Sequence, residues 1–352
     1  MELIYPRDWE EVCICPEVIL YEPRPYRSLR VDLFRVSDGV FTLVSQRNSL
    51  DLKSSKGFVR SLELRDIREP GLYAIVIFEN RLEKPVGQIG LSVVENVEKI
   101  PLTPCLDTIE TLYFIVKRSR FIANGIGKSG TTWLTRLLGT LPGGSVLDMA
   151  AAGLQGISQK EVEKIDFGQV YHGHLRYALE LIEQIESFDV HNVHIYRDLR
   201  DVVVSEYFHK FQLEEGQHQT HLMSHSKDSL LNMDSIYKWS STIYAASSVI
   251  DWMRSGDCTM LRYEDMLTYP EREFARIMDE LGLPHHPNLT KHIIAVNSFE
   301  RATKGRKRGS ADPKSPFRNG TSGNWREHLS PETAAELVAR HEEYFRVLKY
   351  VD

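Results

Sequence analysis

Residues 124–133 read NGIGKSGTTW, and they connect a strand-like run at residues 121–124 to a helical pattern at residues 132–141. Small residues allow backbone N–H groups to approach an anion closely, and the start of a helix adds partial positive charge. Lys128 adds a cation, and Ser129, Thr131 and Thr132 add hydroxyl donors. The stretch therefore predicts a phosphate-binding loop that opens the first strand–helix unit of an α/β fold.

Strand-like and helix-like stretches alternate through the rest of the chain. Three strand-like runs, each followed by a helical pattern, occupy residues 169–172 then 177–186, 193–196 then 201–212, and 260–262 then 270–281. This alternation predicts a parallel sheet with helices on its faces. Two longer helices are expected at residues 234–254 and 331–348.

The first part of the chain has strand patterns without this alternation. Residues 31–36 and 40–44 flank a Ser-Asp-Gly turn, which is a hairpin signal, and further strand-like runs cover residues 58–64, 72–79 and 87–94. Five short strands of this kind predict a small antiparallel sandwich or barrel. The predicted fold class is therefore α/β, with a P-loop-like parallel sheet flanked by helices over residues 111–352. A small all-β, sandwich-like domain of unknown role precedes it over residues 1–110.

The composition of the whole chain narrows the classes of protein further. The chain has 352 residues and a formal net charge of −6, so a nucleic-acid binder with a broadly basic surface is not expected. No apolar run approaches the ~20 residues of a membrane span, and the first residues lack a signal-peptide pattern. The cysteines match no zinc spacing, which predicts reduced thiols and a cytoplasmic location: Cys13, Cys15, Cys105 and Cys258.

Residues 128–133, KSGTTW, closely resemble the 5′-phosphosulfate loop of sulfotransferases that use 3′-phosphoadenosine 5′-phosphosulfate (PAPS), which usually reads PKSGTTW. Gly127 stands at the position of that proline. A P-loop NTPase would instead have a leading glycine, and Ile122 occupies that position. The resemblance implies nucleotide contacts from the whole loop: Lys128, Ser129, Gly130, Thr131, Thr132 and Trp133.

Two later segments resemble the 3′-phosphate segments of the same family. Residues 197–205, RDLRDVVVS, place Arg197 and Ser205 at the two expected phosphate contacts. Residues 317–325, FRNGTSGNW, resemble the late segment that closes over the 3′-phosphate, with Asn319 in place of the usual lysine. The resemblance implies contacts from Arg318, Asn319 and Gly320, and it places Tyr263 and Phe299 near the adenine.

The candidate general base lies in residues 171–175, YHGHL, which resemble the family's Lys-Thr-His-Leu segment. His174 matches the catalytic histidine, and His172 stands where the family has its lysine. Whether His172 replaces the charge of that lysine is left open by the sequence. By resemblance, His174 accepts the proton of the acceptor hydroxyl, the oxygen attacks sulfur in line, and Lys128 stabilises the departing phosphate oxygen. No metal is expected.

The net charge of the chain hides a basic segment. Residues 301–320 carry seven basic residues and one acidic residue, a net charge of +6, so the remaining residues carry −12. A charge run usually forms a solvated face. The position of this run, directly before the late segment, predicts that it closes over a doubly anionic nucleotide.

Taken together, the resemblance implies a sulfotransferase that moves the sulfuryl group from PAPS to a hydroxyl or amine acceptor and releases 3′-phosphoadenosine 5′-phosphate (PAP). The acceptor is expected to be a small molecule, a glycan or a lipid, and neither it nor the oligomeric state can be derived. No nucleic-acid partner and no membrane span are expected. Two alternatives stay open: a P-loop nucleotide kinase-like phosphotransferase, and a non-catalytic nucleotide-binding homologue, which the departures at Gly127, His172 and Asn319 would permit.

Overall fold

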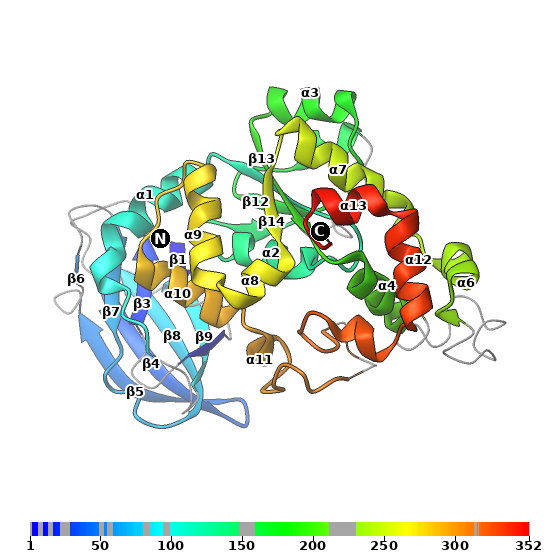
Figure 1. The fold of residues 1–352 in the computed structure, drawn as a ribbon. Helices are drawn as coiled ribbons and strands as arrows, with labels where there is room; N and C mark the ends of the chain where they lie inside the picture. The colour runs from blue at the N-terminus through cyan, green and yellow to red at the C-terminus, as the bar shows by residue number, and fades with distance from the viewer. Residues whose placement is uncertain are drawn as a thin grey trace. The chain divides into compact units, whose positions relative to one another are not determined.

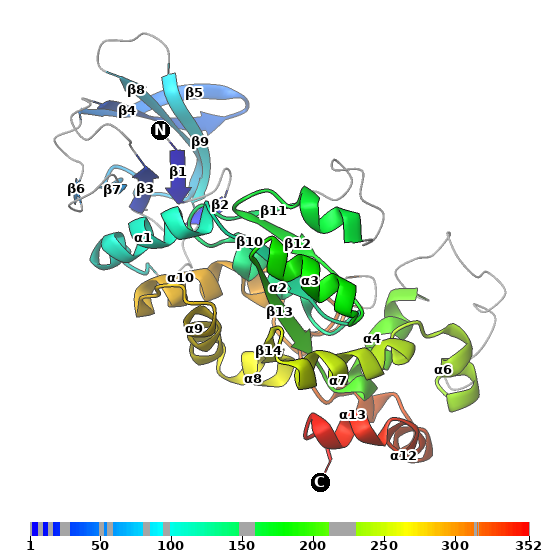
Figure 2. The same cartoon turned by 90° about the horizontal axis from the view of Figure 1, so that it is seen from above.

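The computed structural model describes residues 2–5, 10–12, 17–21, 29–48, 53–54, 59–79, 85–93, 99–147, 159–210, 230–312, 315 and 317–351. The chain divides into two compact units, whose elements are labelled in Figures 1 and 2. One unit is Met1–Ile115 with Pro284–His292, and the other is Val116–Leu283 with Ile293–Asp352. The division into domains at residues 110 and 111 stays a prediction.

The first unit is built from two β-sheets. One sheet has the order β1-β3-β7-β6 and consists of β1 (Glu2–Tyr5), β3 (Glu17–Tyr21), β7 (Val59–Glu63) and β6 (Lys53–Ser54). The other has the order β2-β9-β8-β4-β5 and consists of β2 (Glu10–Val12), β9 (Pro85–Val93), β8 (Gly71–Glu79), β4 (Leu29–Ser37) and β5 (Val40–Asn48). Neighbouring strands are antiparallel except β2, which runs parallel to β9.

The predicted antiparallel β region is confirmed, and it has more strands than expected. Asp38 and Gly39 both have positive φ, as a two-residue hairpin turn requires, and Ser37 pairs with Val40 across it. Apolar side chains from both sheets share one core: Val18, Leu20 and Leu62 from one, and Val31, Leu33, Ile75, Ile77, Ile89 and Leu91 from the other. Strands β1, β2, β3 and β6 were not expected from the sequence.

The second unit has the predicted parallel sheet. Its order is β11-β12-β10-β13-β14, and every neighbouring pair is parallel. The strands are β10 (Arg120–Asn124), β11 (Ser145–Val146), β12 (Gln169–His172), β13 (Val190–Tyr196) and β14 (Thr259–Arg262). Helix α2 (Thr131–Gly139) packs on β10 and β12, and α3 (Leu179–Ser187) packs on β13. The carboxyl ends of β10, β12 and β13 carry the residues that the sequence singled out.

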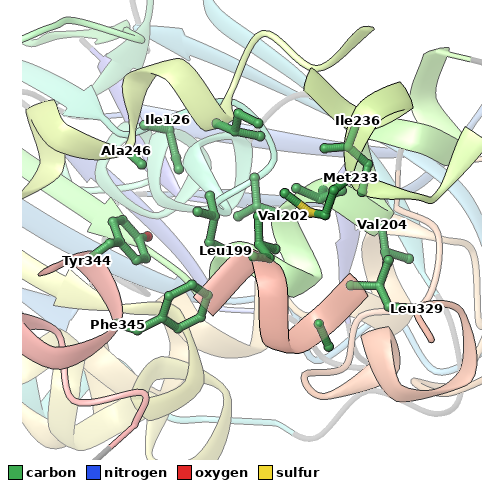
Figure 3. Close-up of a cluster of buried hydrophobic side chains, with 14 of the residues drawn as sticks. Ile126, Leu199, Val202, Val204, Met233, Ile236, Ala246, Leu329, Tyr344 and Phe345 are labelled. Carbon is green, nitrogen blue, oxygen red and sulfur yellow. The ribbon is translucent and has the colours of Figure 1, made fainter. Parts of the chain in front are cut away.

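Helix α4 (Leu199–Phe208) is the centre of the main apolar core of this unit. Its side chains Leu199, Val202 and Val204 pack with residues of several other segments, as Figure 3 shows. Those segments include α6 (Met233–Trp239), α7 (Ala246–Ser255), α12 (Pro331–Arg340) and α13 (Glu342–Val347). Further elements are α1 (Leu106–Val116), α8 (Tyr263–Thr268), α9 (Pro270–Glu280), α10 (Pro287–Val296), α11 (Phe299–Ala302), and the 3₁₀ turns Thr103–Cys105, Gln159–Lys164, Ile243–Ala245 and Asn324–Glu327.

Both predicted long helices are wrong as single helices. Residues 234–254 are divided into α6, a 3₁₀ turn and α7, because Ser240, Ser241 and Thr242 leave the helix to bond the buried carboxylate of Glu206. Residues 331–348 are divided into α12 and α13 at His341, whose ring contacts the hydroxyl of Tyr237 at 2.8 Å. In both cases a polar contact with a distant residue overrides local helical periodicity.

Candidate active site

The phosphate loop joins β10 to α2 through a backbone that few side chains tolerate. Gly125 and Gly130 have φ of +156° and +111°, and Lys128 itself has φ of +66°. A Cβ atom at Gly125 would lie 2.5 Å from the carbonyl oxygen of Ile195, so only glycine fits there. No side chain caps the first turn of α2. The N–H groups of Trp133 and Leu134 bond the carbonyl oxygen of Gly130, so an outside acceptor can take the N–H groups of Thr131 and Thr132, which precede them.

The predicted site residues converge on one cavity of about 550 Å³. Those that line it are Lys128, Gly130, Thr131, Thr132, Trp133, His174, Arg197, Ser205, Tyr263, Phe299, Arg318, Asn319 and Gly320. Ser129 is not among them, because its side chain is fully buried and its Oγ donates to the carbonyl oxygen of Ile126 at 2.7 Å. The hydroxyl of Ser129 thus closes the loop on itself.

Gly127, at the position of the family's proline, also lines this cavity. A Cβ atom at Gly127 would lie 2.8 Å from the Cγ2 methyl of Thr242. A real Cβ does not approach a β-branched methyl this closely, so a proline would displace Thr242. The departure at Gly127 is therefore matched by the packing around it.

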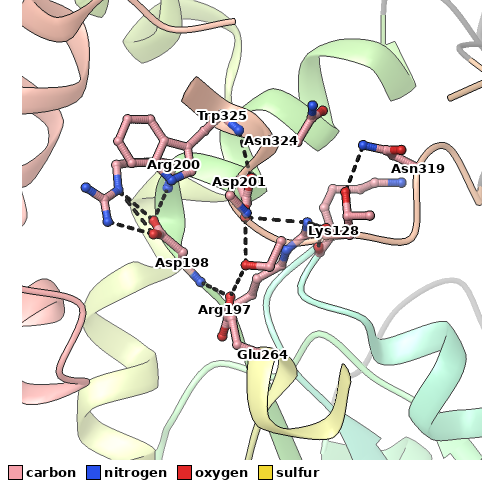
Figure 4. Close-up of polar contacts among 12 residues, drawn as sticks. Lys128, Arg197, Asp198, Arg200, Asp201, Glu264, Asn319, Asn324 and Trp325 are labelled. Carbon is pink, nitrogen blue, oxygen red and sulfur yellow. Dashed lines mark hydrogen bonds and ion pairs between the residues drawn. The ribbon is translucent and has the colours of Figure 1, made fainter. Parts of the chain in front are cut away.

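Arg197 lies at the end of β13 and connects the loop with the late segment, as Figure 4 shows. Its Nη2 donates to the carbonyl oxygen of Thr321 at 2.8 Å and its Nη1 to that of Lys128 at 3.4 Å. The guanidinium carbon lies 4.4 Å from the ring centre of Tyr263. Three segments that are remote in the sequence are thus held around one buried cation.

The late segment is anchored by a carboxylate whose role the sequence did not reveal. Asp198 is the N-cap of α4, while Asp201 in the first turn accepts bonds from the backbone N–H groups of Gly323 (2.6 Å) and Trp325 (3.0 Å). The Oγ of Ser322 adds a third bond to Asp201 at 3.2 Å. Hydrogen bonds to a buried carboxylate are among the stronger ones, so α4 fixes the backbone that follows Arg318 to Gly320.

Aromatic rings form another wall of the cavity. Trp133 and Tyr263 meet edge to face with ring centres 6.1 Å apart, and the guanidinium of Arg308 lies 5.6 Å from the ring centre of Trp133. Gly320 has φ of +67°, and a Cβ atom there would lie 2.5 Å from the ring of Phe299. The absence of a side chain at Gly320 is what allows that ring to pack in its place.

The ring of His174 has a defined tautomer. Its Nδ1 lies 2.7 Å from the carbonyl oxygen of Gly125. A carbonyl oxygen can only accept, so Nδ1 carries the proton and Nε2 of the neutral ring is a bare acceptor. This is the arrangement that a general base requires.

His172 does not supply the charge of the family's lysine. Burial, together with the neighbouring His174, lowers the pKa of His172 to about 4. Its Nδ1 lies 2.9 Å from the hydroxyl of Thr135, and its ring centre is 5.1 Å from that of His174. At neutral pH the His172 ring is therefore uncharged.

Several polar residues line the cavity without having been predicted from the sequence: Arg136, Glu206, His209, Lys210, Ser241, Thr242 and Asn297. Glu206 is buried and bonds the backbone N–H and Oγ of Ser241 at 2.9 Å each, and the Nζ of Lys210 at 3.0 Å. Burial alone would raise the pKa of Glu206, but the hydrogen bonds from Ser240 and Thr242 lower it overall. No short sequence motif predicts the hydrogen-bond network of Glu206, because most of the residues in it lie far apart in the sequence.

Among the described residues of the basic segment 301–320, two cations line the cavity. Arg308 and Arg318 line it, whereas Arg306 holds the segment together through the carbonyl oxygens of Ser310 and Arg318. Lys304 and Lys307 are exposed. In the part of this segment that the structure describes, the charge at the cavity therefore comes from arginines, and the two lysines Lys304 and Lys307 are solvated.

Metal ligands and membrane-crossing helices can be assessed only for the described residues. Among them, no group of three or more His, Cys, Asp or Glu side chains could hold a metal ion. Within the same part of the chain, no helix combines the length and the apolar character that crossing a bilayer demands. Cys258 is a free thiol, the Sγ of the buried Cys105 donates to the carbonyl oxygen of Leu102 at 3.0 Å, and Cys13 and Cys15 lie outside the described residues.

Comparisons with known proteins identify the family. The family profile described as the sulfotransferase domain matches residues 118–346. A flavonol sulfotransferase-like protein of Flaveria bidentis is 23% identical, over 60% of this chain and 76% of the relative. Among solved structures, mouse sulfotransferase SULT7A1 complexed with PAP has 17% identity and a TM-score of 0.48, and covers 67% of this chain and 89% of its own. Retinol dehydratase in complex with androsterone and PAP has 16% identity and a TM-score of 0.43. The match covers 78% of this chain and 88% of the retinol dehydratase chain. The profile spans more than half of the chain, and the protein therefore belongs to the sulfotransferase family.

Proposed function

We propose that this sulfotransferase uses PAPS as donor and transfers its sulfuryl group to a hydroxyl or amine acceptor. The observation that carries the proposal is that the phosphate loop, Arg197 with Ser205, the aromatic wall and His174 all line one cavity. The sequence motifs assign each of these groups to a different part of PAPS or to the reaction. Their convergence is what a single donor molecule in that cavity requires.

The polar atoms of the cavity fit an anionic purine nucleotide. Buried donor atoms without a partner among the described residues are Nε1 of Trp133, Nε of Arg197 and Nε of Arg318. Buried donors of this kind cost free energy unless a ligand accepts from them. Arginine forks suit phosphate oxygens, and the Oδ1 of Asn319 is a buried acceptor that also has no partner in the same residues.

Different residues of the chain have different roles in the transfer. PAPS, when bound, supplies the activated sulfuryl group, and the reaction is an in-line displacement at sulfur. His174 accepts the acceptor's proton on Nε2, while its Nδ1–H remains bonded to Gly125. Lys128 and the uncapped N–H groups of α2 stabilise negative charge on the phosphate oxygen that leaves. His172, being neutral, contributes orientation and no charge.

The relative affinities for PAP and for Mg-ATP distinguish a PAPS-dependent sulfotransferase from a kinase-like phosphotransferase. We expect PAP to bind the full chain without Mg²⁺, and removal of its 3′-phosphate to weaken binding about 100-fold, since Arg197, Ser205 and Arg318 would lose their ligand. Isothermal titration calorimetry with PAP, 5′-AMP and Mg-ATP measures this directly. Tighter binding of Mg-ATP than of PAP would favour the kinase instead. PAP binding without transfer to any acceptor would favour a non-catalytic homologue.

The proposal also covers the acceptor, the role of residues 1–110 and the location of the protein. The acceptor is a small molecule, glycan or lipid that carries a hydroxyl group, and residues 1–110 form an accessory β domain. We place the protein in the cytoplasm, which the free thiol of Cys258 supports. A screen of hydroxylated acceptors with ³⁵S-labelled PAPS tests the acceptor class.

A further inference from the structure

A second, smaller cavity of about 190 Å³ adjoins the wall of the first. The two cavities have Gly127, His174, Ser241 and Thr242 in common. The second cavity also reaches Ser248 and, at its inner wall, His194. His174 thus stands between the space assigned to the nucleotide and a separate space on its other side.

His194 is unusual in the wall of this cavity. It lies on β13, its side chain is 1% exposed, and neither ring nitrogen has a partner among the described residues. The ring of Trp252 lies beside it with centres 5.9 Å apart. An imidazole buried without partners costs free energy unless something in the cavity bonds to it.

Neighbouring polar groups in the same wall already have partners. The Oγ of Ser248 accepts from the backbone N–H of Tyr177 at 2.6 Å, and the hydroxyls of Ser241 and Thr242 donate to Glu206. These groups need no ligand. Arg176 also lines this cavity, but it is exposed to solvent. Among the buried polar side chains described in this wall, His194 is therefore the group whose hydrogen-bonding capacity a ligand can complete.

The chemistry of the missing partner follows from the state of the ring. Burial, together with His174, lowers the pKa of His194 to about 3, so the ring is neutral at physiological pH. A neutral imidazole offers one N–H donor and one bare nitrogen, which match a hydroxyl in either direction. A cavity of about 150 Å³ accommodates a benzene ring, so about 190 Å³ is suited to a body of one six-membered ring.

We infer that the smaller cavity holds the acceptor, and that His194 determines specificity by bonding a second, neutral polar group at the far end of a ring-sized acceptor. The reacting hydroxyl then lies at His174, which belongs to both cavities. This inference rests on the proposed function. It selects acceptors with two polar ends over acceptors with one.

The first test compares two acceptors of the same shape. We expect 4-(hydroxymethyl)phenol to be sulfated on its phenol with a kcat/KM about tenfold or more above that of 4-methylphenol, because the latter leaves His194 unpaired. The products are separated by chromatography with ³⁵S-labelled PAPS as donor. Equal kcat/KM values, or transfer to other acceptors with neither of these two used, would overturn the inference.

Substitutions then assign the preference to one residue. His194→Leu should reduce the ratio of the two kcat/KM values to about one, while His194→Gln, which keeps hydrogen-bonding groups, should retain most of it. His191→Leu is the matched control, because His191 lies on the same strand, stacks on Phe121 with ring centres 5.1 Å apart, and lines neither cavity. An unchanged ratio in His194→Leu, or an equal loss in His191→Leu, would contradict the role of His194.

A binding measurement without turnover completes the test. The full chain is saturated with PAP, and each acceptor is titrated into it by calorimetry, alongside His194→Gln and His194→Leu. We expect the two-ended acceptor to bind about tenfold more tightly to the wild type and equally to His194→Leu. If PAP binds and the two acceptors bind alike, the acceptor assignment is wrong. If PAP itself does not bind, the proposed function is wrong.

Discussion

Gly320 lacks a side chain at a position where a side chain would collide with Phe299. A Cβ atom there would lie 2.5 Å from the ring, and φ is +67°, so any substitution must move a wall of the nucleotide cavity. Asn319, one residue earlier, replaces a lysine of the family pattern and is buried with its Nδ2 bonded to Thr321. At this wall of the cavity, the packing of Phe299 against Gly320 and the bond of Asn319 to Thr321 thus stand where the family pattern has a charged lysine.

The prediction at this scale is that Gly320→Ala weakens PAP binding at least tenfold. Gly309→Ala is the matched control, because Gly309 has φ of +87° and no atom within 4 Å of its Cβ position. Both substitutions carry the backbone cost of about 1–2 kcal/mol for a left-handed conformation, and only the first displaces Phe299. Calorimetric titration of PAP measures the difference. Equal affinities of the two variants would contradict the proposed place of Phe299.

At the scale of elements, α4 is joined to the break between α6 and α7 by Glu206. Its carboxylate is bonded by Ser240 (2.6 Å), Ser241 and Thr242, and by Lys210 (3.0 Å). The helix is interrupted between α6 and α7 because Ser240, Ser241 and Thr242 form hydrogen bonds to the buried carboxylate of Glu206. This interruption also sets Ser241 and Thr242 in the wall that both cavities have in common.

Glu206→Gln should lower the free energy of unfolding by about 2–3 kcal/mol, since hydrogen bonds to a buried charge are lost while Lys210 stays. The control Glu183→Gln removes an exposed carboxylate on α3. It should change the free energy of unfolding by less than about 0.5 kcal/mol. Urea denaturation followed by circular dichroism measures both. Similar small effects in the two variants would show that Glu206 is not a structural anion.

The sequence predicted the elements whose signals are local. The strand–helix units of the parallel sheet follow from periodicity within single segments, and β10, β12 and α9 begin or end within a residue of the expected positions. The break at Ser240 could not be predicted, because it depends on Glu206 in another helix. The space around Gly320 depends in the same way on Phe299, and the place of His194 in a cavity wall depends on the several segments that form that cavity.

At the scale of the whole molecule, four histidines with lowered pKa values contribute to the change of stability with pH. Burial lowers the pKa of His172, His191, His194 and His341 below the ordinary value. As pH falls below about 6.5, the unfolded chain therefore takes up protons that the folded chain does not. Stability is fully present above that pH and is lost as pH falls toward the lowered values, at up to about 1.4 kcal/mol per pH unit for each group.

Urea midpoints at pH 7.5, 6.5, 5.5 and 4.5 test this expectation. They should fall steadily below pH 6.5, and His194→Gln should fall less steeply than the wild type because one such group is removed. A midpoint that stays constant or rises between pH 7.5 and 5.5 would contradict the neutral state of these rings.

We propose that one cavity binds the donor nucleotide and that His174 removes the acceptor's proton within it. The most direct measurement is ³⁵S transfer from PAPS to a hydroxyl acceptor by the wild type and by His174→Ala, with PAP affinity measured on the same samples. We predict a loss of transfer of about 10²–10⁴-fold in His174→Ala, with PAP affinity within about threefold of the wild type because the nucleotide contacts remain. Transfer by His174→Ala at the wild-type rate would contradict the claim.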